Sequence, residues 1–254
     1  MNQGFFRCES VREIAPNIYI LTLHAPEIAE RTNPGQFLNI RTGDNFIPLL
    51  RRPFSVYHRD GARLQIIFNV VGAGTKILAS SSVGHPLDVI GPLGNHFGVS
   101  GDFEEAILVA GGLGVAPMPI LTTELKKEGK AIRTFLGARN ETQIVRRHLE
   151  QVSVATDDGS DGHRGTVVDL LRNWLPGAPK RSRKIFACGP TPMLRALSLF
   201  AGEFSVACEL SLESPMACGI GICQGCPVEL RDGAKKYALI CRDGTVFNSN
   251  DVVL

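Results

Sequence analysis

Apolar and polar residues alternate in two different ways along the chain, and the change falls near residue 100. Between Gly4 and Pro92, short apolar stretches are separated by turn-forming Gly, Pro, Asn and Asp residues. These stretches include Ile18–Leu23, Gln36–Ile40, Phe54–His58 and Leu64–Val71. Short strands that recur with turn signals between them are typical of an antiparallel barrel. Residues 1–100 are therefore expected to form a β-barrel domain.

Beyond Gly101, continuous apolar runs alternate with helical patterns. The expected buried strands are Ala106–Ala110, Ala131–Leu136, Gln151–Ala155 and Lys184–Ala187. Helical spacing runs up to Lys127 after the first strand, over Val167–Trp174 and over Thr191–Ala201. Buried strands that alternate with helices predict a parallel, wound α/β sheet. We assign this second domain to residues 101–205.

Four cysteines near the C-terminal end have a spacing that indicates a metal centre. They form a C-x4-C-x2-C run followed, after fourteen intervening residues, by a fourth cysteine, and they are Cys218, Cys223, Cys226 and Cys241. This is the ligand spacing of a plant-type [2Fe–2S] cluster. The glycines of the run, Gly219, Gly221 and Gly225, permit the tight bends that aim three thiolates at one small core.

Zinc and disulfides are the alternatives for these cysteines. Four-cysteine zinc sites usually combine two C-x2-C pairs, and this chain has only one such pair, so zinc is the weaker hypothesis and disulfides are weaker still. Two short strand candidates, Pro227–Leu230 and Tyr237–Ile240, accompany the cysteines. Residues 206–254 are expected to form a small iron–sulfur domain.

Composition and charge restrict the class of protein. The formal net charge is +2, with basic and acidic residues interspersed, which argues against nucleic acid or a membrane surface as partner. The apolar stretch Ala106–Leu121 is too short to span a bilayer comfortably and contains glycines and prolines. Met1–Ser10 lacks the apolar core of a signal peptide. Seven cysteines without a secretory signal fit a reducing compartment, so we expect a cytoplasmic protein.

Two short motifs in the barrel resemble the flavin-binding pair of the ferredoxin-reductase family. Arg52-Pro53-Phe54-Ser55 is expected on a strand, and Gly72-Ala73-Gly74-Thr75 leads into a short helix about twenty residues later. A guanidinium suits a diphosphate because it donates charge-assisted bonds in pairs. The resemblance implies that Arg52 pairs with the FAD pyrophosphate, that Gly74 and Thr75 meet the same anion, that Phe54 lies along the flavin ring and that Ser55 faces its reactive nitrogen. Without the second motif, the first would only indicate a strand with an exposed arginine.

A glycine-rich turn follows the first strand of the α/β part. Gly111, Gly112 and Gly114 would let the pyrophosphate of a dinucleotide approach the backbone, although a plain βα turn is the alternative. Cys188-Gly189-Pro190 follows a later strand, and this corner recurs beside the nicotinamide in ferredoxin-reductase-like proteins. A small Cys188 there would leave room for the nicotinamide, whereas the alternative is a buried structural cysteine.

The choice between NAD and NADP depends on residues after the second α/β strand. A 2′-phosphate would be expected to meet basic residues there, and Arg139 is such a residue. Glu141 lies nearby and would oppose a phosphate. We therefore favour NAD, mainly on the resemblance described next. The six histidines are scattered along the chain, and each is expected at the surface.

Over essentially its full length the chain resembles the electron-transfer subunits of class 1B dihydroorotate dehydrogenases. The resemblance rests on Arg-Arg-Pro-Phe-Ser, Gly-Pro-Leu-Gly-Asn, Gly-Gly-Leu-Gly-Val-Ala-Pro-Met, Cys-Gly-Pro-Thr-Pro-Met and Met-Ala-Cys-Gly-Ile-Gly. It implies FAD at Arg52–Ser55, at Ile67, Phe68 and Asn69, and at Gly74–Thr75, with the cluster on the four cysteines. Asn69 stands where relatives often have a basic residue.

The same resemblance implies a reaction and a partner. Electrons would pass from dihydroorotate, oxidised at FMN in a separate catalytic subunit, through the [2Fe–2S] cluster and FAD to NAD⁺, in pyrimidine biosynthesis. The assembly would be a heterotetramer, with Ser55 and Cys188 at the point of hydride transfer. One alternative is a reductase subunit of a sulfhydrogenase or NADPH–ferredoxin type. Another is a non-catalytic electron-relay module, against which the intact Gly111–Pro117 and Cys188–Pro190 motifs argue.

Overall fold

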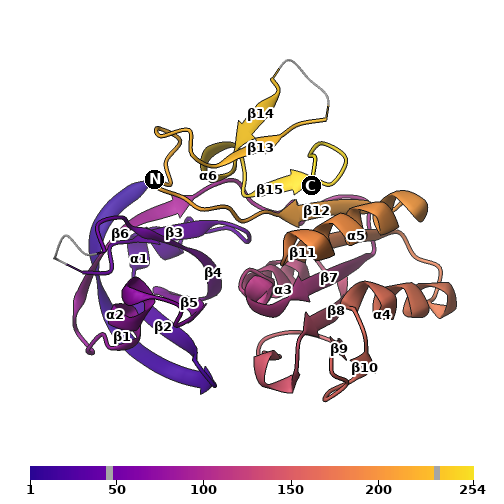
Figure 1. Ribbon diagram of the computed structural model, residues 1–254, viewed down its shortest axis with the longest axis horizontal. Coiled ribbons are helices and arrows are strands. Elements are labelled where there is room, and N and C mark those ends of the chain that lie inside the picture. The colour runs from indigo at the N-terminus through magenta and orange to yellow at the C-terminus, as the bar shows by residue number, and fades with distance from the viewer. Residues whose placement is uncertain (44–47, 232–234) are drawn as a thin grey trace.

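In the computed structural model, which describes residues 1–43, 48–231 and 235–254, the N-terminal strands close into a six-stranded barrel (Figure 1). The strands are β1 (Asn2–Ala15), β2 (Ile18–His24), β3 (Phe37–Ile40), β4 (Arg52–Asp60), β5 (Arg63–Asn69) and β6 (Pro86–Leu93). They pair in the order β1-β2-β5-β4-β3-β6, and every pairing is antiparallel. The predicted antiparallel barrel is thus confirmed.

The alternation of side chains along the barrel strands separates an interior from an outer face. Leu38 and Ile40 are fully buried in the interior, together with the ring of Phe54. Because successive side chains of a strand point to opposite faces, Phe37 and Asn39 lie on the outer side of β3. Two short helices, α1 (Pro26–Ala29) and α2 (Ala73–Ala79), lie in the connections between strands.

A seven-stranded sheet forms the second part of the molecule. Its strands are β7 (Glu105–Gly111), β8 (Ala131–Ala138), β9 (Val152–Thr156), β10 (His163–Arg164), β11 (Arg183–Cys188), β12 (Ala207–Ser211) and β15 (Val246–Asn248). They pair in the order β10-β9-β8-β7-β11-β12-β15, and all are parallel except β15, which runs antiparallel to β12. The predicted fold class, a barrel followed by a wound α/β sheet, is confirmed.

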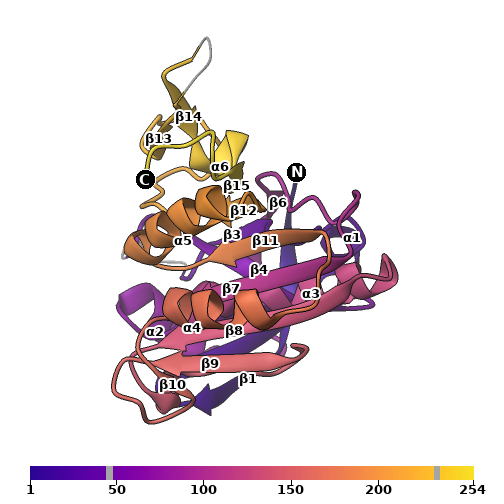
Figure 2. The same ribbon diagram turned by 90° about the vertical axis from the view of Figure 1, so that its right-hand side faces the viewer.

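Helices cover both faces of this sheet, and Figure 2 looks onto one of these faces. On one face, α4 (Val167–Trp174) and α5 (Thr191–Glu203) pack through Leu171 and Leu197 against Ile107 and Val109 of β7. On the other face, α3 (Met118–Lys127) packs against the alternate residues of β7, and outer barrel residues such as Ile67 join the same hydrophobic cluster. The barrel and the sheet therefore share one continuous apolar contact.

The cysteine segment forms a small unit between two strands of the large sheet. The hairpin β13 (Pro227–Glu229) and β14 (Tyr237–Leu239) is followed by α6 (Ile240–Asp243), and this unit projects above the barrel and the sheet in Figure 1. Strands β12 and β15, which flank it in sequence, belong to the large sheet. Both lie within residues 206–254, so part of the segment predicted as an iron–sulfur domain completes the α/β sheet.

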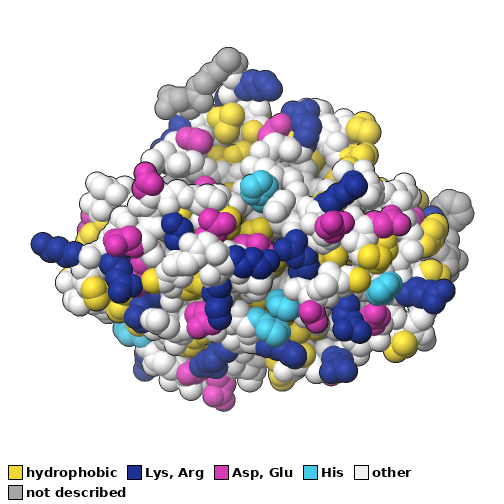
Figure 3. Space-filling model, turned by 180° about the vertical axis from the view of Figure 1, so that it is seen from behind, with side chains coloured by type: hydrophobic (Ala, Val, Ile, Leu, Met, Phe, Trp, Pro, Cys, Tyr) yellow, Lys and Arg dark blue, Asp and Glu magenta, His cyan; other side chains and the backbone are white. Residues whose placement is uncertain are grey.

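Short single-turn 3₁₀ helices occur at Gly112–Val115, Glu141–Gln143 and Leu175–Gly177. Figure 3 shows Lys and Arg side chains interspersed with Asp and Glu on the face that it presents, in agreement with the mixed charge of the sequence. No helix in the described ranges is long and apolar enough to cross a membrane.

Candidate functional site

The two motifs of the expected flavin site meet in space at the start of β4 and of α2. A Cβ atom at Gly74 would lie 3.4 Å from both Cγ and Nε of Arg52, and 3.1 Å from Oγ1 of Thr42. Thr42 is 1% exposed, and its hydroxyl has no hydrogen-bond partner among the described residues. Arg52 donates from Nη1 to the carbonyl oxygen of Leu50 at 2.6 Å. A guanidinium, a free hydroxyl and a side-chain-free backbone thus converge as a diphosphate requires.

Thr75 stabilises the turn of the second motif through hydrogen bonds to residues three and four positions before it. Its Oγ1 accepts hydrogen bonds from the backbone N–H groups of Val71 at 2.9 Å and Gly72 at 3.2 Å. The same hydroxyl donates to the carbonyl oxygen of Gly72 at 3.1 Å. Thr75 therefore fixes the turn that brings Gly74 to Arg52.

The remaining flavin-motif residues divide between the two faces of the barrel. Ser55 pairs with Phe37, and Pro53 pairs with Asn39 across the β3–β4 ladder. Paired residues share a face, so Pro53 and Ser55 lie on the outer side of the barrel. Phe37 on that side belongs to the hydrophobic cluster of the large sheet, so Ser55 faces the α/β part.

Phe54 lies on the opposite side from Ser55. Its side chain is 9% exposed, and its ring centroid is 5.7 Å from that of Phe68 within the barrel core. Stacking of Phe54 on a flavin ring stays a prediction. On β5, Ile67 and Phe68 are buried, while Asn69 is half-buried at the end of the strand.

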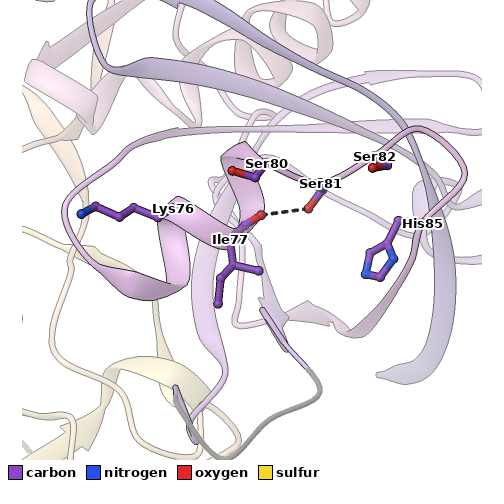
Figure 4. Close-up of a pocket in the computed structure, with 6 residues that line it drawn as sticks. All are labelled: Lys76, Ile77, Ser80, Ser81, Ser82 and His85. Atoms are coloured by element: carbon purple, nitrogen blue, oxygen red, sulfur yellow. Dashed lines mark hydrogen bonds between the residues drawn. The ribbon is translucent and has the colours of Figure 1, made fainter.

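A surface pocket of about 430 Å³ lies beyond the end of α2 (Figure 4). It is lined by Lys76, Ile77, Ser80, Ser81, Ser82 and His85. Ser81 donates from Oγ to the carbonyl oxygen of Ile77 at 3.3 Å, as the dashed line in Figure 4 marks. None of the residues predicted from the flavin, nucleotide or cysteine motifs lines this pocket, so it lies apart from the candidate site.

The glycine turn after β7 packs directly on the Cys188-Gly189-Pro190 corner after β11. A Cβ atom at Gly114 would lie 2.2 Å from the carbonyl oxygen of Cys188 and 2.7 Å from Cα of Gly189. At Gly111 it would lie 2.8 Å from Cδ of Pro190. Gly112 has a φ of +54°, which an L-residue seldom adopts. The structure thus brings the two predicted nucleotide motifs together.

Cys188 is fully buried behind this turn, and a carboxylate lies near it. Its Sγ is 4.0 Å from Oε1 of Glu213, at the start of the segment that leads to the cysteine loop. Burial first, and then Glu213, raise the pKa of the Cys188 thiol far above its usual range. Burial also raises the pKa of the Glu213 carboxyl. Cys188 is therefore a small neutral group rather than a thiolate nucleophile.

The four predicted ligands occupy one loop and the start of α6. Cys223 is exposed, Cys218 is half-buried, and Cys226 and Cys241 are each 2% exposed. All seven cysteines of the chain are free, and the Sγ atoms of Cys226 and Cys241 are 3.2 Å apart. Within the described ranges, no group of three or more His, Cys, Asp or Glu side chains is arranged to hold a metal ion. The fit to an iron–sulfur cluster rests on the donor type, the spacing and the local hydrogen bonds.

Backbone N–H groups already point at the cysteine sulfurs. Ile220 and Cys223 donate from their backbone nitrogens to Sγ of Cys218 at 3.5 Å and 3.4 Å. Burial opposes ionisation of Cys218, but these donors outweigh it and lower its pKa to about 6. Burial and the adjacent Cys226 raise the pKa of Cys241 to about 12. Positive φ values of +70° at Gly219 and +84° at Gly221 produce the bends that aim these groups inward.

Two residues of this region carry no motif in the sequence. The tertiary fold alone brings Thr42 close to Gly74 and Glu213 close to Cys188. Nothing in the local sequence distinguishes either one from an ordinary polar residue. Two further residues were considered for the choice between NAD and NADP. Arg139 lies directly after β8, and Glu141 begins the following 3₁₀ helix.

Comparison with known families gives consistent matches. A family model described as the iron–sulfur cluster binding domain of dihydroorotate dehydrogenase B matches residues 213–253. The dihydroorotate dehydrogenase B (NAD(+)) electron transfer subunit of Desulforamulus reducens is 36% identical over 253 residues. That alignment covers 96% of this chain and 95% of the relative.

Solved structures share the architecture as well. The structure of an NADH-dependent reduced ferredoxin–NADP oxidoreductase, studied for flavin-based electron bifurcation, matches with a TM-score of 0.86 at 28% identity. The match covers 98% of this chain and 90% of the matched chain. Phthalate dioxygenase reductase matches with a TM-score of 0.68 at 18% identity, covering 91% of this chain and 88% of that chain, and supports the fold alone.

Proposed function

The chain belongs to the family of dihydroorotate dehydrogenase B electron transfer subunits, and we propose that it passes electrons from a catalytic partner subunit to NAD⁺. The observation that supports this most is the packing of Gly114 on the Cys188 corner, on a sheet that also contacts the flavin barrel. Val115 after this turn and Ile67 of the barrel lie in one hydrophobic cluster, which supports a nucleotide bound next to a flavin. A flavin exchanges both single electrons and a hydride, so FAD can connect a one-electron [2Fe–2S] cluster to NAD⁺.

The barrel residues bind and orient the flavin. Arg52, Thr42 and the open backbone at Gly74 hold the diphosphate of FAD, because they present donors around a space without a side chain. Ser55 faces the α/β part and lies at the reacting edge of the flavin. On the outer side of the barrel, Pro53, Ile67 and Asn69 form the surface for the flavin, and Phe54 and Phe68 support it from the barrel core.

The α/β residues admit the nicotinamide nucleotide. Gly112 leaves the backbone of the turn open to its pyrophosphate, since a Cβ atom there would meet nothing within 4 Å, while Gly111 and Gly114 let the turn pack on the Cys188 corner. Cys188 is neutral and buried, so its contribution is space for the nicotinamide next to the flavin rather than covalent chemistry. NAD is the expected nucleotide, as the name of the Desulforamulus relative states for that protein.

The four cysteines hold the [2Fe–2S] cluster. Cys218, Cys223, Cys226 and Cys241 supply soft thiolate ligands, which iron–sulfur clusters require. The N–H donors of Ile220 and Cys223 stabilise negative charge on the Cys218 sulfur. Because Cys223 is exposed, the loop faces outward, where a partner subunit can approach it.

Each of the three parts of the chain binds one cofactor. Residues 1–100 bind FAD, residues 101–205 bind NAD, and residues 206–254 bind the cluster. The catalytic partner carries FMN and oxidises dihydroorotate in pyrimidine biosynthesis, and the two kinds of subunit form a heterotetramer in the cytoplasm. The term electron transfer subunit in the names of the relatives supports the existence of such a partner.

Reconstitution tests this function. The isolated chain, purified anaerobically, should contain one FAD and a two-iron cluster per chain, and should reduce a dye with NADH but not oxidise dihydroorotate. Addition of an FMN-containing catalytic subunit should restore NADH formation from dihydroorotate. Rapid mixing that follows FMN bleaching and NADH formation separately would show which electron-transfer step is blocked in the Cys223→Ser variant. Dihydroorotate oxidation by the isolated chain would overturn the assignment of subunits.

One related function shares the same cofactors. The ferredoxin–NADP oxidoreductase match at a TM-score of 0.86 favours a reductase subunit of another complex as the second candidate. The identity to the dihydroorotate dehydrogenase relative is higher, 36% against 28%, and supports the first. Electron transfer from reduced ferredoxin, with none from an FMN subunit of dihydroorotate dehydrogenase, would establish the second function instead.

A further inference from the structure

Asn39 connects the strand beside the flavin motif to the cysteine loop. It lies on the outer side of β3, directly opposite Pro53 of β4, and is only 1% exposed. Its side-chain Nδ2 donates a hydrogen bond to the carbonyl oxygen of Cys218 at 3.0 Å. The two residues are 179 positions apart in sequence. This single contact therefore joins the predicted flavin strand to the first predicted cluster ligand.

The amide of Asn39 is placed for donation rather than for packing. A carbonyl oxygen can only accept, so the NH₂ end of the amide must face Cys218. The other end, Oδ1, is buried and has no hydrogen-bond partner within the described part of the chain. A buried polar atom without a partner is unfavourable, and an apolar side chain of the same shape would avoid it. The donor to Cys218 is thus what asparagine supplies at this position.

The cysteine loop is shaped around this amide. Gly219 has a φ of +70°, and a Cβ atom there would lie 2.5 Å from Nδ2 of Asn39. On the other side of the same turn, Sγ of Cys218 receives the N–H groups of Ile220 and Cys223. Holding the Cys218 carbonyl therefore fixes the orientation of the peptide units that direct the first thiolate and its donors.

We propose that Asn39 is a positioning residue that anchors the Cys218–Gly219 turn to the flavin-bearing strand pair and so sets the position of the cluster relative to the flavin. The inference rests on the proposed function, since it concerns the same two redox groups. Asn39 acts through Cys218 and not on a reacting atom. Its role is to keep the first ligand and the N–H donors of its sulfur in one arrangement.

Two variants of nearly the same size remove the donor. Asn39→Leu replaces the amide with an apolar group, and Asn39→Asp keeps the shape of the side chain while presenting only acceptors at neutral pH. Asn17→Asp is the matched control. Asn17 donates from Nδ2 to the carbonyl oxygen of Val70 at 3.0 Å, so it joins two segments of the barrel without contacting the cysteine loop or α6.

The measurements use the anaerobically purified, cofactor-loaded chain. We compare the electron paramagnetic resonance spectrum and the midpoint potential of the reduced cluster, the rate of iron release to a chelator, and hydrogen exchange over residues 218–226. Loss of Asn39 should change the spectrum and lower the potential, because the N–H donors to the Cys218 sulfur loosen. Iron release should accelerate roughly two- to tenfold, the factor that follows from losing one neutral hydrogen bond. Exchange should rise in the loop.

The control separates this role from general stabilisation. Asn17→Asp should lower the unfolding midpoint while leaving the spectrum and the potential of the cluster as in the parent. If both Asn39 variants match the parent in spectrum, potential and loop exchange, the inference is overturned. If Asn17→Asp shifts the spectrum as much as the Asn39 variants do, Asn39 has no specific role. A parent chain that lacks FAD or iron would instead overturn the proposed function.

Discussion

Gly114→Ala tests whether the contact between the glycine turn and the Cys188 corner builds the nucleotide site. The φ of Gly114 lies outside the left-handed region, so alanine suits the backbone there and the effect comes from the added methyl group alone. That methyl group would lie 2.2 Å from the carbonyl oxygen of Cys188 and 2.5 Å from its carbonyl carbon. Both are backbone atoms, which cannot turn away as a side-chain end can.

The required displacement follows from these distances. Ordinary contact begins at 3.4 Å, so the turn and the Cys188 corner must separate by 3.4 − 2.2 = 1.2 Å along that direction. A misplacement of about 1 Å at a site of group transfer can cost about a hundredfold in rate. Overpacking of this kind also destabilises a fold by about 1–3 kcal/mol. We therefore expect kcat/KM for NADH to fall about a hundredfold while the chain remains folded.

Dye reduction by NADH is the assay, with FAD and iron content measured on the same samples. The FAD and iron contents should both match the parent, because Arg52, Gly74 and the cysteine loop do not belong to the turn that is changed. Gly202→Ala is the control, since a Cβ atom at Gly202, at the end of α5, meets nothing within 4 Å. A Gly114→Ala chain that is folded, loaded and as active with NADH as Gly202→Ala would refute the assignment of this turn to the nucleotide.

Arg52→Ala should weaken FAD retention roughly ten- to a hundredfold in ultrafiltration, because a charge-assisted contact contributes about 1.5–3 kcal/mol, and unchanged retention would exclude β4 from the flavin site. Cys223→Ser should strongly lower iron content because a hydroxyl is a hard, poor ligand, whereas serine at Cys208, which is buried outside the loop, should spare it; equal losses would contradict the ligand set. Burial, then His148, lower the pKa of His58, and burial and Arg147 lower that of His148. The unfolded chain therefore binds more protons than the folded chain below pH about 6.5, and stability falls as the pH decreases. His148→Asn should reduce the loss of urea stability between pH about 7.5 and about 5.5, and an unchanged loss would show that this pair is not its source.

The periodicity of the sequence was sufficient for most of the fold because the strands are strongly apolar and bounded by clear turns. Ala106–Ala110 falls within β7, and the predicted helix Val167–Trp174 coincides with α4. The short strands β10, β12 and β15 carried too little pattern to be distinguished. In β12 and β15, polar residues such as Glu209 and Asn248 interrupt the apolar run, and only pairing with a neighbour makes these segments strands.

Motifs predicted the parts of the candidate site that depend on local chain geometry. Cysteine spacing and glycine turns can be recognised in sequence because the bend and the ligands belong to one short segment. Contacts between residues far apart in the sequence could not be predicted in this way. His58 and His148, expected as separate surface residues, stack with ring centroids 4.3 Å apart where β4 meets the loop after β8. No local sequence pattern indicates this contact between the two histidines.

The place of the cysteine unit in the sheet explains how a small loop can be held rigidly near a flavin. The unit enters from β12 and returns through β15, and these two strands pair with each other through Glu209–Asn248, Leu210–Phe247 and Ser211–Val246. Its two ends are thereby fixed on the sheet that also carries Cys188, through the β11–β12 pairing. Asn39 adds an attachment from the barrel at the first cysteine, and Asn95 adds another at the end of α6. Attachments from two different sheets restrict both the distance and the rotation of the loop, which attachment at its ends alone would leave free.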